Sequence, residues 1–206
     1  MLDPIQPYFT YSALAIEEDE ANAIVKETIR TYRIDGAELK GASLVRHNRG
    51  RKAITSILER CASKALVSAW HKRYCLATKF FEYVFEPVVA EKNSIFYDAG
   101  FHRFISNVMF SEALTNNHRA ETALLAFQEI ARSHNSAAVA GLFPAKIIEP
   151  GYSEIVGDIQ AFVVANQAVI EADIASHSNG DPLYRWLLDL SVSALFADVG
   201  AAVRLT

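Results

Sequence analysis

The chain has 206 residues, a formal net charge of −4 and a hydrophobic fraction of 51%, and its pI is about 5.9. A chain of this length and composition can bury a substantial core, so we expect one globular domain over residues 1–206. The acidic balance excludes attraction of the whole molecule to nucleic acid or to an anionic membrane. Any phosphate-bearing partner must therefore meet a local basic patch.

The sequence also predicts the cellular location of the protein and the redox state of its two cysteines. No segment reaches the ~18 consecutive apolar residues of a membrane-spanning helix, and the N-terminus lacks the pattern of a signal peptide, so we expect a cytoplasmic protein. Cys61 and Cys75 fall on separate predicted elements without the spacing of metal ligands. Two reduced, buried thiols are therefore predicted.

The first part of the chain alternates between strand and helix patterns. Aromatic and apolar residues dominate residues 8–16, which predicts a mostly buried strand, and a helix follows that ends before Gly36. A short extended segment around Glu38, a helix over 49–61 and a central strand over 65–70 come next. This alternation is typical of an α/β sheet.

The second part of the chain has helical periodicity almost throughout. The predicted helices cover residues 74–85, 95–114, 118–132, 153–175 and 182–203. We therefore expect a sheet-containing core over 1–90 and a mainly helical extension over 91–206.

A charged segment between two glycines is the first candidate site. Glu38 and Lys40 stand one residue apart, and the flexible backbone at Gly36 and Gly41 leaves room for a ligand to approach. In an extended segment the two side chains share a face, where a carboxylate and an ammonium can hold one polar substrate. The same charges also suit an exposed edge strand, where they discourage aggregation. Both interpretations are open.

Two basic segments are further candidates for binding an anion. The first could form a phosphate-facing rim, or simply a solvated loop and helix start. It contains Arg46, His47, Arg49, Arg51 and Lys52. The second, His71 and Lys72, closes the predicted strand 65–70, where functional side chains are common but where charges also serve as plain gatekeepers after an apolar run.

Three short motifs of the chain match the pattern of a known family. They are Glu38, Leu39 and Lys40, then Trp70, His71 and Lys72, and the aromatic Tyr83 and Phe85. On these motifs the chain resembles the bacterial family called domain of unknown function 3800, well over about the first ninety residues and only loosely over the helical remainder. This resemblance implies a ribonuclease H-like mixed sheet and a metal-dependent nuclease or related phosphoryl-transfer activity with Mg²⁺ or Mn²⁺.

The resemblance also implies roles for individual residues. Glu38 would be a metal ligand in the catalytic site, and Lys40 or Lys72 would hold the phosphate as a point charge. Nucleic acid would be the substrate, bound through a local basic patch. The residues expected in that patch are Arg46, Arg49, Arg51, Lys52 and His71.

The chain departs from the family pattern at both ends. The leading strand with an Asp-Glu-Ser signature and the closing Asp-bearing segment are not recognised, so we expect a truncated family member. An alternative hypothesis is a non-catalytic binding or interaction protein. Without the leading strand, the sheet edge beside residues 8–16 is open to pairing with another chain, which would allow a homo-oligomer.

Overall fold

The computed structural model describes residues 6–36, 38–115, 118–133, 135–143 and 153–178. Contacts within the chain divide these residues into two units. The described residues from 6 to 9 and from 69 to 178 belong to unit 1, and those from 10 to 68 belong to unit 2. Along the sequence, unit 2 is therefore inserted between two stretches of unit 1.

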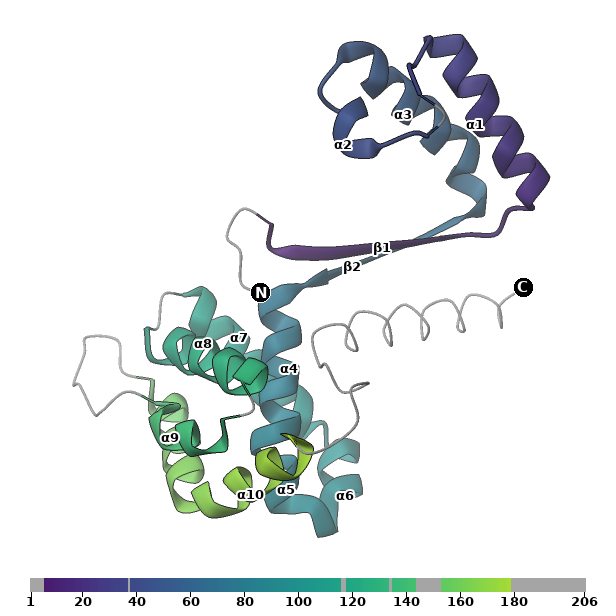
Figure 1. The fold of residues 1–206 in the computed structure, drawn as a ribbon. Helices are drawn as coiled ribbons and strands as arrows, with labels where there is room; N and C mark the ends of the chain where they lie inside the picture. Colours follow the sequence, from purple (N-terminus) through teal and green to yellow (C-terminus); the bar gives the residue numbers. More distant parts are fainter. Residues whose placement is uncertain (1–5, 37, 116–117, 134, 144–152, 179–206) are drawn as a thin grey trace. The chain divides into compact units, whose positions relative to one another are not determined.

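The first 71 residues contain two strands with helices between them (Figure 1). The elements are β1 (Tyr8–Leu14), α1 (Glu18–Tyr32), α2 (Gly41–Leu44), α3 (Asn48–Cys61), the 3₁₀ helix η1 (Ala62–Lys64) and β2 (Ala65–His71). Strands were predicted at 8–16 and 65–70, and helices before Gly36 and over 49–61. The positions of these four elements are confirmed to within a few residues, but the prediction that the strand over 8–16 is mostly buried is wrong, because its side chains are exposed or half-buried.

The two strands pair antiparallel in one register. The Lys72 N–H donates to the Pro7 carbonyl (2.8 Å), and the Ala15 N–H donates to the Lys64 carbonyl (2.9 Å). The same register holds at both ends, and Tyr8 accordingly meets His71 with ring centroids 5.0 Å apart. Side chains of β1 alternate between exposed and half-buried along the strand, as expected of a sheet with one covered face.

The predicted ribonuclease H-like mixed sheet is wrong. Within the described residues the sheet has two strands, β1 and β2, and most other residues are helical. The short extended segment around Glu38 is not a strand: Gly36 has a φ of 116°, and α2 begins at Gly41. The predicted central strand 65–70 is thus one half of a two-stranded ribbon, and the described residues contain no pair of parallel strands.

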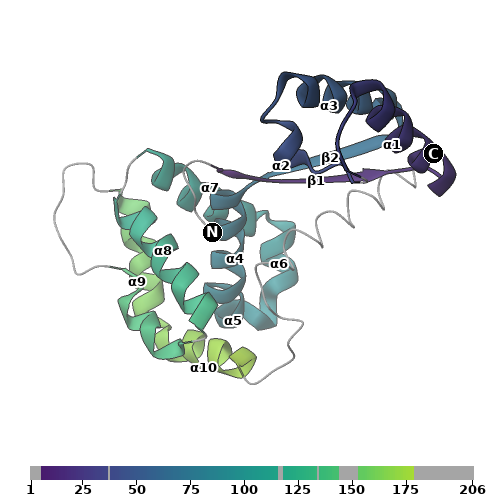
Figure 2. The ribbon, with the colours of Figure 1, turned by 45° about the horizontal axis from the view of Figure 1, so that its top comes forward.

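Helices α1 and α3 pack against each other within unit 2 and lie on the same side of the ribbon (Figure 2). The residues buried in these helices are mostly small: Thr28 beside Ile24 on α1, and Ala53 and Cys61 on α3. Small side chains allow two helices to approach closely, but they bury little apolar area. Unit 2 therefore has only a thin core.

The rest of the described chain is a set of helices around α4. They are α4 (Lys72–Val84), α5 (Glu86–Val89), η2 (Ala90–Lys92), α6 (Asn93–Asp98), α7 (Phe101–Leu114), α8 (His118–Ser133), η3 (Ser136–Gly141), α9 (Glu154–Ala165) and α10 (Gln167–Ser178). Helix α4 contacts α5, α7, α8 and α10. It can do so because its apolar residues recur at the spacing of a wide helix face. These residues are Leu76, Ala77, Phe80, Phe81 and Val84, and all are buried.

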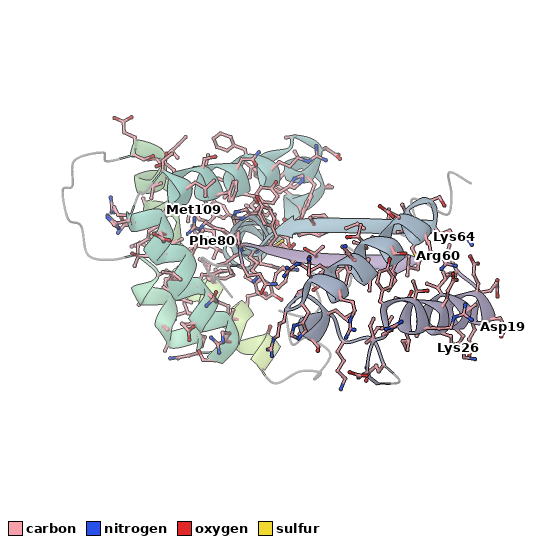
Figure 3. The ribbon with its side chains drawn as sticks, turned by 90° about the horizontal axis from the view of Figure 1, so that it is seen from above. Asp19, Lys26, Arg60, Lys64, Phe80 and Met109 are labelled. Carbon is pink, nitrogen blue, oxygen red and sulfur yellow. The ribbon has the colours of Figure 1, made fainter. Side chains whose placement is uncertain are left out.

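Aromatic side chains dominate the core of unit 1. Phe80 and Phe127 meet edge to face at 5.4 Å, and Phe85 stacks on Phe162 at 4.4 Å. Figure 3 shows Phe80 and Met109 among the side chains inside this unit. Because each buried aromatic ring removes a large apolar area from water, the core stabilises unit 1 strongly.

Two long predicted helices are each divided in two. Residues 95–114 were predicted as one helix, but Gly100 adopts a left-handed conformation (φ 73°) between α6 and α7. Residues 153–175 break at Asn166, whose side-chain amide donates to the Phe162 carbonyl (2.8 Å) and competes with the helical backbone. The predicted helix over 182–203 lies outside the described residues.

No single helix in the described residues is long and apolar enough to cross a membrane. Helices α9 and α10 meet the criteria of length and composition only as a pair, with a bend of 70° between them.

Candidate functional site

Glu38 and Lys40 form an exposed ion pair at the start of α2. Their side-chain oxygen and nitrogen are 3.5 Å apart, and the two side chains are 76% and 71% exposed. Lys40 is the N-cap residue of α2, where its carbonyl accepts hydrogen bonds from the Ser43 and Leu44 N–H groups. The structure therefore brings the predicted acid and base together, in water rather than in a closed site.

The residues around Glu38 do not fit a magnesium or manganese site. Such a site needs several oxygen ligands directed at one point. Within the described residues, no group of three or more His, Cys, Asp or Glu side chains is placed to hold a metal ion. The one expected ligand, Glu38, faces an ammonium instead of another carboxylate.

The turn between α2 and α3 is held in one conformation by two contacts. A Cβ added at Gly50 would lie 2.2 Å from the Leu44 carbonyl oxygen, so only glycine allows α2 to pack this closely on α3. The Arg51 guanidinium donates to the Val45 carbonyl (3.0 Å) at the C-terminus of α2. Arg51, predicted to bind substrate, thus has a structural hydrogen bond within the turn.

This turn is rich in basic residues and contains no acidic residue in its own sequence. From Leu39 to Leu58 the sequence contains no Asp or Glu. Arg51 is exposed but donates to the Val45 carbonyl, and the exposed cations of this stretch with neither an ion pair nor a side-chain hydrogen bond among the described residues are Arg46, Arg49 and Lys52, which together we call the basic turn. The first turn of α3 also contains no acidic residue. Backbone N–H groups and cations at one helix start therefore combine to favour an anion.

Acidic partners occur at the other end of α3. Arg60 donates to Glu27 of α1 (2.7 Å), and Lys64 pairs with Glu20 (2.6 Å). The hydrogen bond from Arg60, and then its charge, lower the pKa of the Glu27 carboxyl. Arg60 and Lys64 are labelled in Figure 3, with Asp19 and Lys26 along α1. Charge on α3 is thus neutralised at its C-terminal end and left unpaired at its N-terminal end.

His71 and Lys72 lie at the junction of β2 and α4 in unit 1. The His71 ring packs between Tyr8 and Phe110, each with its centroid 5.0 Å away, and its buried Nδ1 has no hydrogen-bond partner in the described structure. Burial, and then the charge of Arg73, lower the pKa of His71. Lys72 is buried, with its ammonium 5.1 Å from the centre of the Phe9 ring.

The structure thus distributes the predicted site residues over two units. Glu38, Lys40 and the basic turn belong to unit 2, whereas His71 and Lys72 belong to unit 1. The side chains of His71 and Lys72 contact aromatic rings, which is a packing role. The basic turn is the set of predicted residues that exposes unpaired charge.

A groove between α7 and α9 was not anticipated. It encloses about 360 Å³ and is lined by Phe104, Asn107, Val108, Ser111, Glu112, Ser153 and Ile155. Phe104 and Val108 lie on an apolar stripe of α7. Phe104 is in fact half exposed, because the apolar stripe on α7 is wider than the surface that the neighbouring helices cover. Periodicity alone cannot distinguish the covered part from the exposed part.

Comparison with known proteins finds no matching family model, no matching curated protein and no matching solved structure. The family resemblance drawn from the motifs therefore stays a prediction.

Proposed function

We propose that the protein binds nucleic acid, and that the basic turn of unit 2 contacts the phosphate backbone. The observation that supports this most is the exposed charge of Arg46, Arg49 and Lys52, which have no ion pair among the described residues, in a protein with a net charge of −4. An acidic protein has no general attraction to polyanions, so a local excess of cations points to a specific contact.

The chemistry of the turn suits phosphate oxygens. Arginine presents paired N–H donors that match a phosphate, and the free N–H groups at the start of α3 add to the positive potential. The contact of Gly50 with Leu44 and the hydrogen bond of Arg51 fix the backbone that displays these side chains. Binding therefore does not have to order a flexible loop, which lowers its entropic cost.

Cleavage of the bound strand is a further proposal, and it rests on the family resemblance. The resemblance assigns Glu38 as a ligand of Mg²⁺ or Mn²⁺ and Lys40 to the phosphate, but the described residues around Glu38 do not provide the further oxygen ligands that such an ion needs. The alternative, a non-catalytic binding protein, is supported by the exposure of Glu38 and by its pairing with Lys40. Binding through the basic turn is common to both proposals.

The proposal is tested with fluorescein-labelled single-stranded DNA and RNA of one sequence, using anisotropy titrations at several salt concentrations. We expect the triple variant Arg46→Gln, Arg49→Gln, Lys52→Gln to lose affinity by about tenfold or more and to reduce the salt slope by about 2 to 3. A charge-matched control replaces three exposed cations of other elements, Lys26, Lys92 and Arg103, with glutamine. Equal losses in the two triple variants would contradict a specific role for the basic turn.

Cleavage is measured separately with the same strands and added Mg²⁺ or Mn²⁺. A nuclease that uses Glu38 would lose cleavage in Glu38→Gln and keep it in the control Glu59→Gln, which changes another exposed carboxylate of unit 2. Binding without cleavage in the wild type would favour the non-catalytic alternative.

A further inference from the structure

The outer edge of β1 carries backbone groups that have no partner strand in the described structure. Because Pro7 and Ala15 bond to the neighbouring chain segment of β2, the odd-numbered residues of β1 face β2. The N–H and C=O groups of the even-numbered residues consequently point away from it. These residues are Tyr8, Thr10, Ser12 and Leu14, and all four are exposed.

This edge lacks the features that normally prevent strands from pairing. The segment Tyr8–Leu14 reads YFTYSAL and contains no charge, no proline and no glycine. Its register with β2 is the same at both ends, which indicates a regular strand without a net bulge. A two-stranded ribbon is also marginal by itself, and added strands stabilise it.

We propose that two copies of this protein pair antiparallel through the outer edges of β1, with a two-fold axis beside Tyr11. In this register Tyr8 lies opposite Leu14 of the second copy, and Thr10 lies opposite Ser12 of the second copy. The residues with outward backbone groups thus form the hydrogen-bonded pairs. The two ribbons become one four-stranded sheet.

The side chains of β1 are complementary to themselves in that register. Tyr8 and Leu14 are each 49% exposed, so their pairing covers apolar surface on both copies. Thr10 and Ser12 bring hydroxyl groups together, a favourable cross-strand pair. Two-fold symmetry brings no like charges together because the strand has none. The outer edge of β1 is therefore complementary to a second copy of the same strand.

The outer edge of β2 is less suitable for the same pairing. It begins after Lys64 and ends before Lys72. Each end of β2 is thus flanked by a lysine, a residue that disfavours edge pairing, whereas β1 has no charged residue within Tyr8–Leu14. The choice between the two edges can be tested directly.

The first test measures molecular mass by light scattering over a range of protein concentrations. We expect the wild type to approach twice 22.8 kDa at high concentration. Thr10→Pro should halve that mass, because it removes an outward N–H while leaving the bonds to β2 intact. The control Val67→Lys, on the outer edge of β2, should stay dimeric. A wild type of 22.8 kDa throughout, or a dimer lost only in Val67→Lys, overturns the proposal.

The second test reports the register and does not depend on a variant that weakens the strand. Tyr11→Cys places two thiols opposite each other across the axis, where Cα atoms of a non-hydrogen-bonded pair are about 4.5 Å apart and can form a disulfide. Leu14→Cys places them roughly 20 Å apart. Mild oxidation should cross-link the first variant and not the second, and both native cysteines are buried. Equal cross-linking, or none in Tyr11→Cys, overturns the proposed register.

Discussion

The two units of this protein are stabilised in different ways. In unit 1, large apolar side chains such as Phe80, Phe127 and Met109 are completely buried. In unit 2 the buried positions are mainly small residues, among them Gly50 and Ala53, and ion pairs surround them. An aromatic core stabilises the folded state because it removes a large apolar area from water. A contact between small residues stabilises it because the two backbones pack closely together.

This difference suggests a division of roles. A deep core makes the backbone of unit 1 insensitive to surface changes, whereas unit 2 exposes most of its charged side chains. Because unit 2 has a small core, it can expose the charged side chains of the basic turn without losing much buried apolar area. If this view is right, substitutions of similar size should have very different effects in the two units.

The largest effect is expected from truncation in the core of unit 1. Leu124 and Leu125 are neighbours on α8, with 0% and 42% of their surface exposed. Leu124→Ala should lower the free energy of unfolding by about 2–5 kcal/mol, because a cavity replaces the side chain. Leu125→Ala should cost well under half as much. Urea denaturation followed by circular dichroism measures both, and similar losses would remove the case for a well-defined core in unit 1.

A smaller but specific effect is expected at the close contact of unit 2. Gly50→Ala forces its new Cβ against the backbone of Leu44, so we expect a loss of roughly 1–3 kcal/mol in stability, and weaker binding of oligonucleotides. Gly41→Ala is the matched control, since nothing lies within 4 Å of its added Cβ. The same denaturation and anisotropy measurements apply. If Gly50→Ala had the stability and the oligonucleotide affinity of the wild type, the close packing of α2 on α3 would not be what holds the turn.

A pH-dependent effect is expected in unit 1. The pKa of His71 is lowered in the folded protein, so as the pH falls below about 6.5 the unfolded chain takes up a proton first and the folded state loses stability. Above that pH both states are neutral and the contribution is absent. His71→Phe keeps the ring between Tyr8 and Phe110 but cannot titrate. Its stability should vary less than the wild type between about pH 7 and 5, and an identical pH profile would argue against this assignment.

The smallest effect is expected from an ion pair at the surface of unit 2. Arg60→Gln should return the pKa of Glu27 towards its ordinary value, which an NMR titration of the carboxyl can follow. Because the folded pKa is lowered, the pair stabilises above the unfolded pKa of Glu27 and ceases to do so as the pH falls through the folded pKa. Added salt should weaken the effect. A Glu27 pKa that does not respond to Arg60→Gln would show that the two residues are not coupled in solution.

Local patterns in the sequence were sufficient to locate most elements. The apolar runs at 8–16 and 65–70 are strands, and helical periodicity predicted α3 and α8 closely. The failures occur where a single residue changes the backbone. Gly100 and Asn166 interrupt helices across which the apolar period continues. The number of strands in the sheet was not predictable, because pairing depends on residues distant in the sequence.

The candidate site was predictable only in part, for similar reasons. The proximity of Glu38 and Lys40 follows from their spacing of one residue, and the basic character of the turn is visible in the sequence. The burial of Lys72 over Phe9 is not visible in the sequence, because 63 positions separate the two residues along the chain. The requirement for glycine at position 50 was not predictable either, because it arises from a contact between two helices.

The two cysteines make it possible to follow the local unfolding of each unit. Cys61 lies in unit 2 and Cys75 in unit 1, and both thiols are free and buried. Burial raises the pKa of Cys75, which further suppresses its reaction with alkylating reagents in the closed state. The chain thus contains one native chemical reporter in each unit. Labelling each thiol over time, and locating the label by peptide mass, would measure the local opening of the two units separately in the unmodified protein.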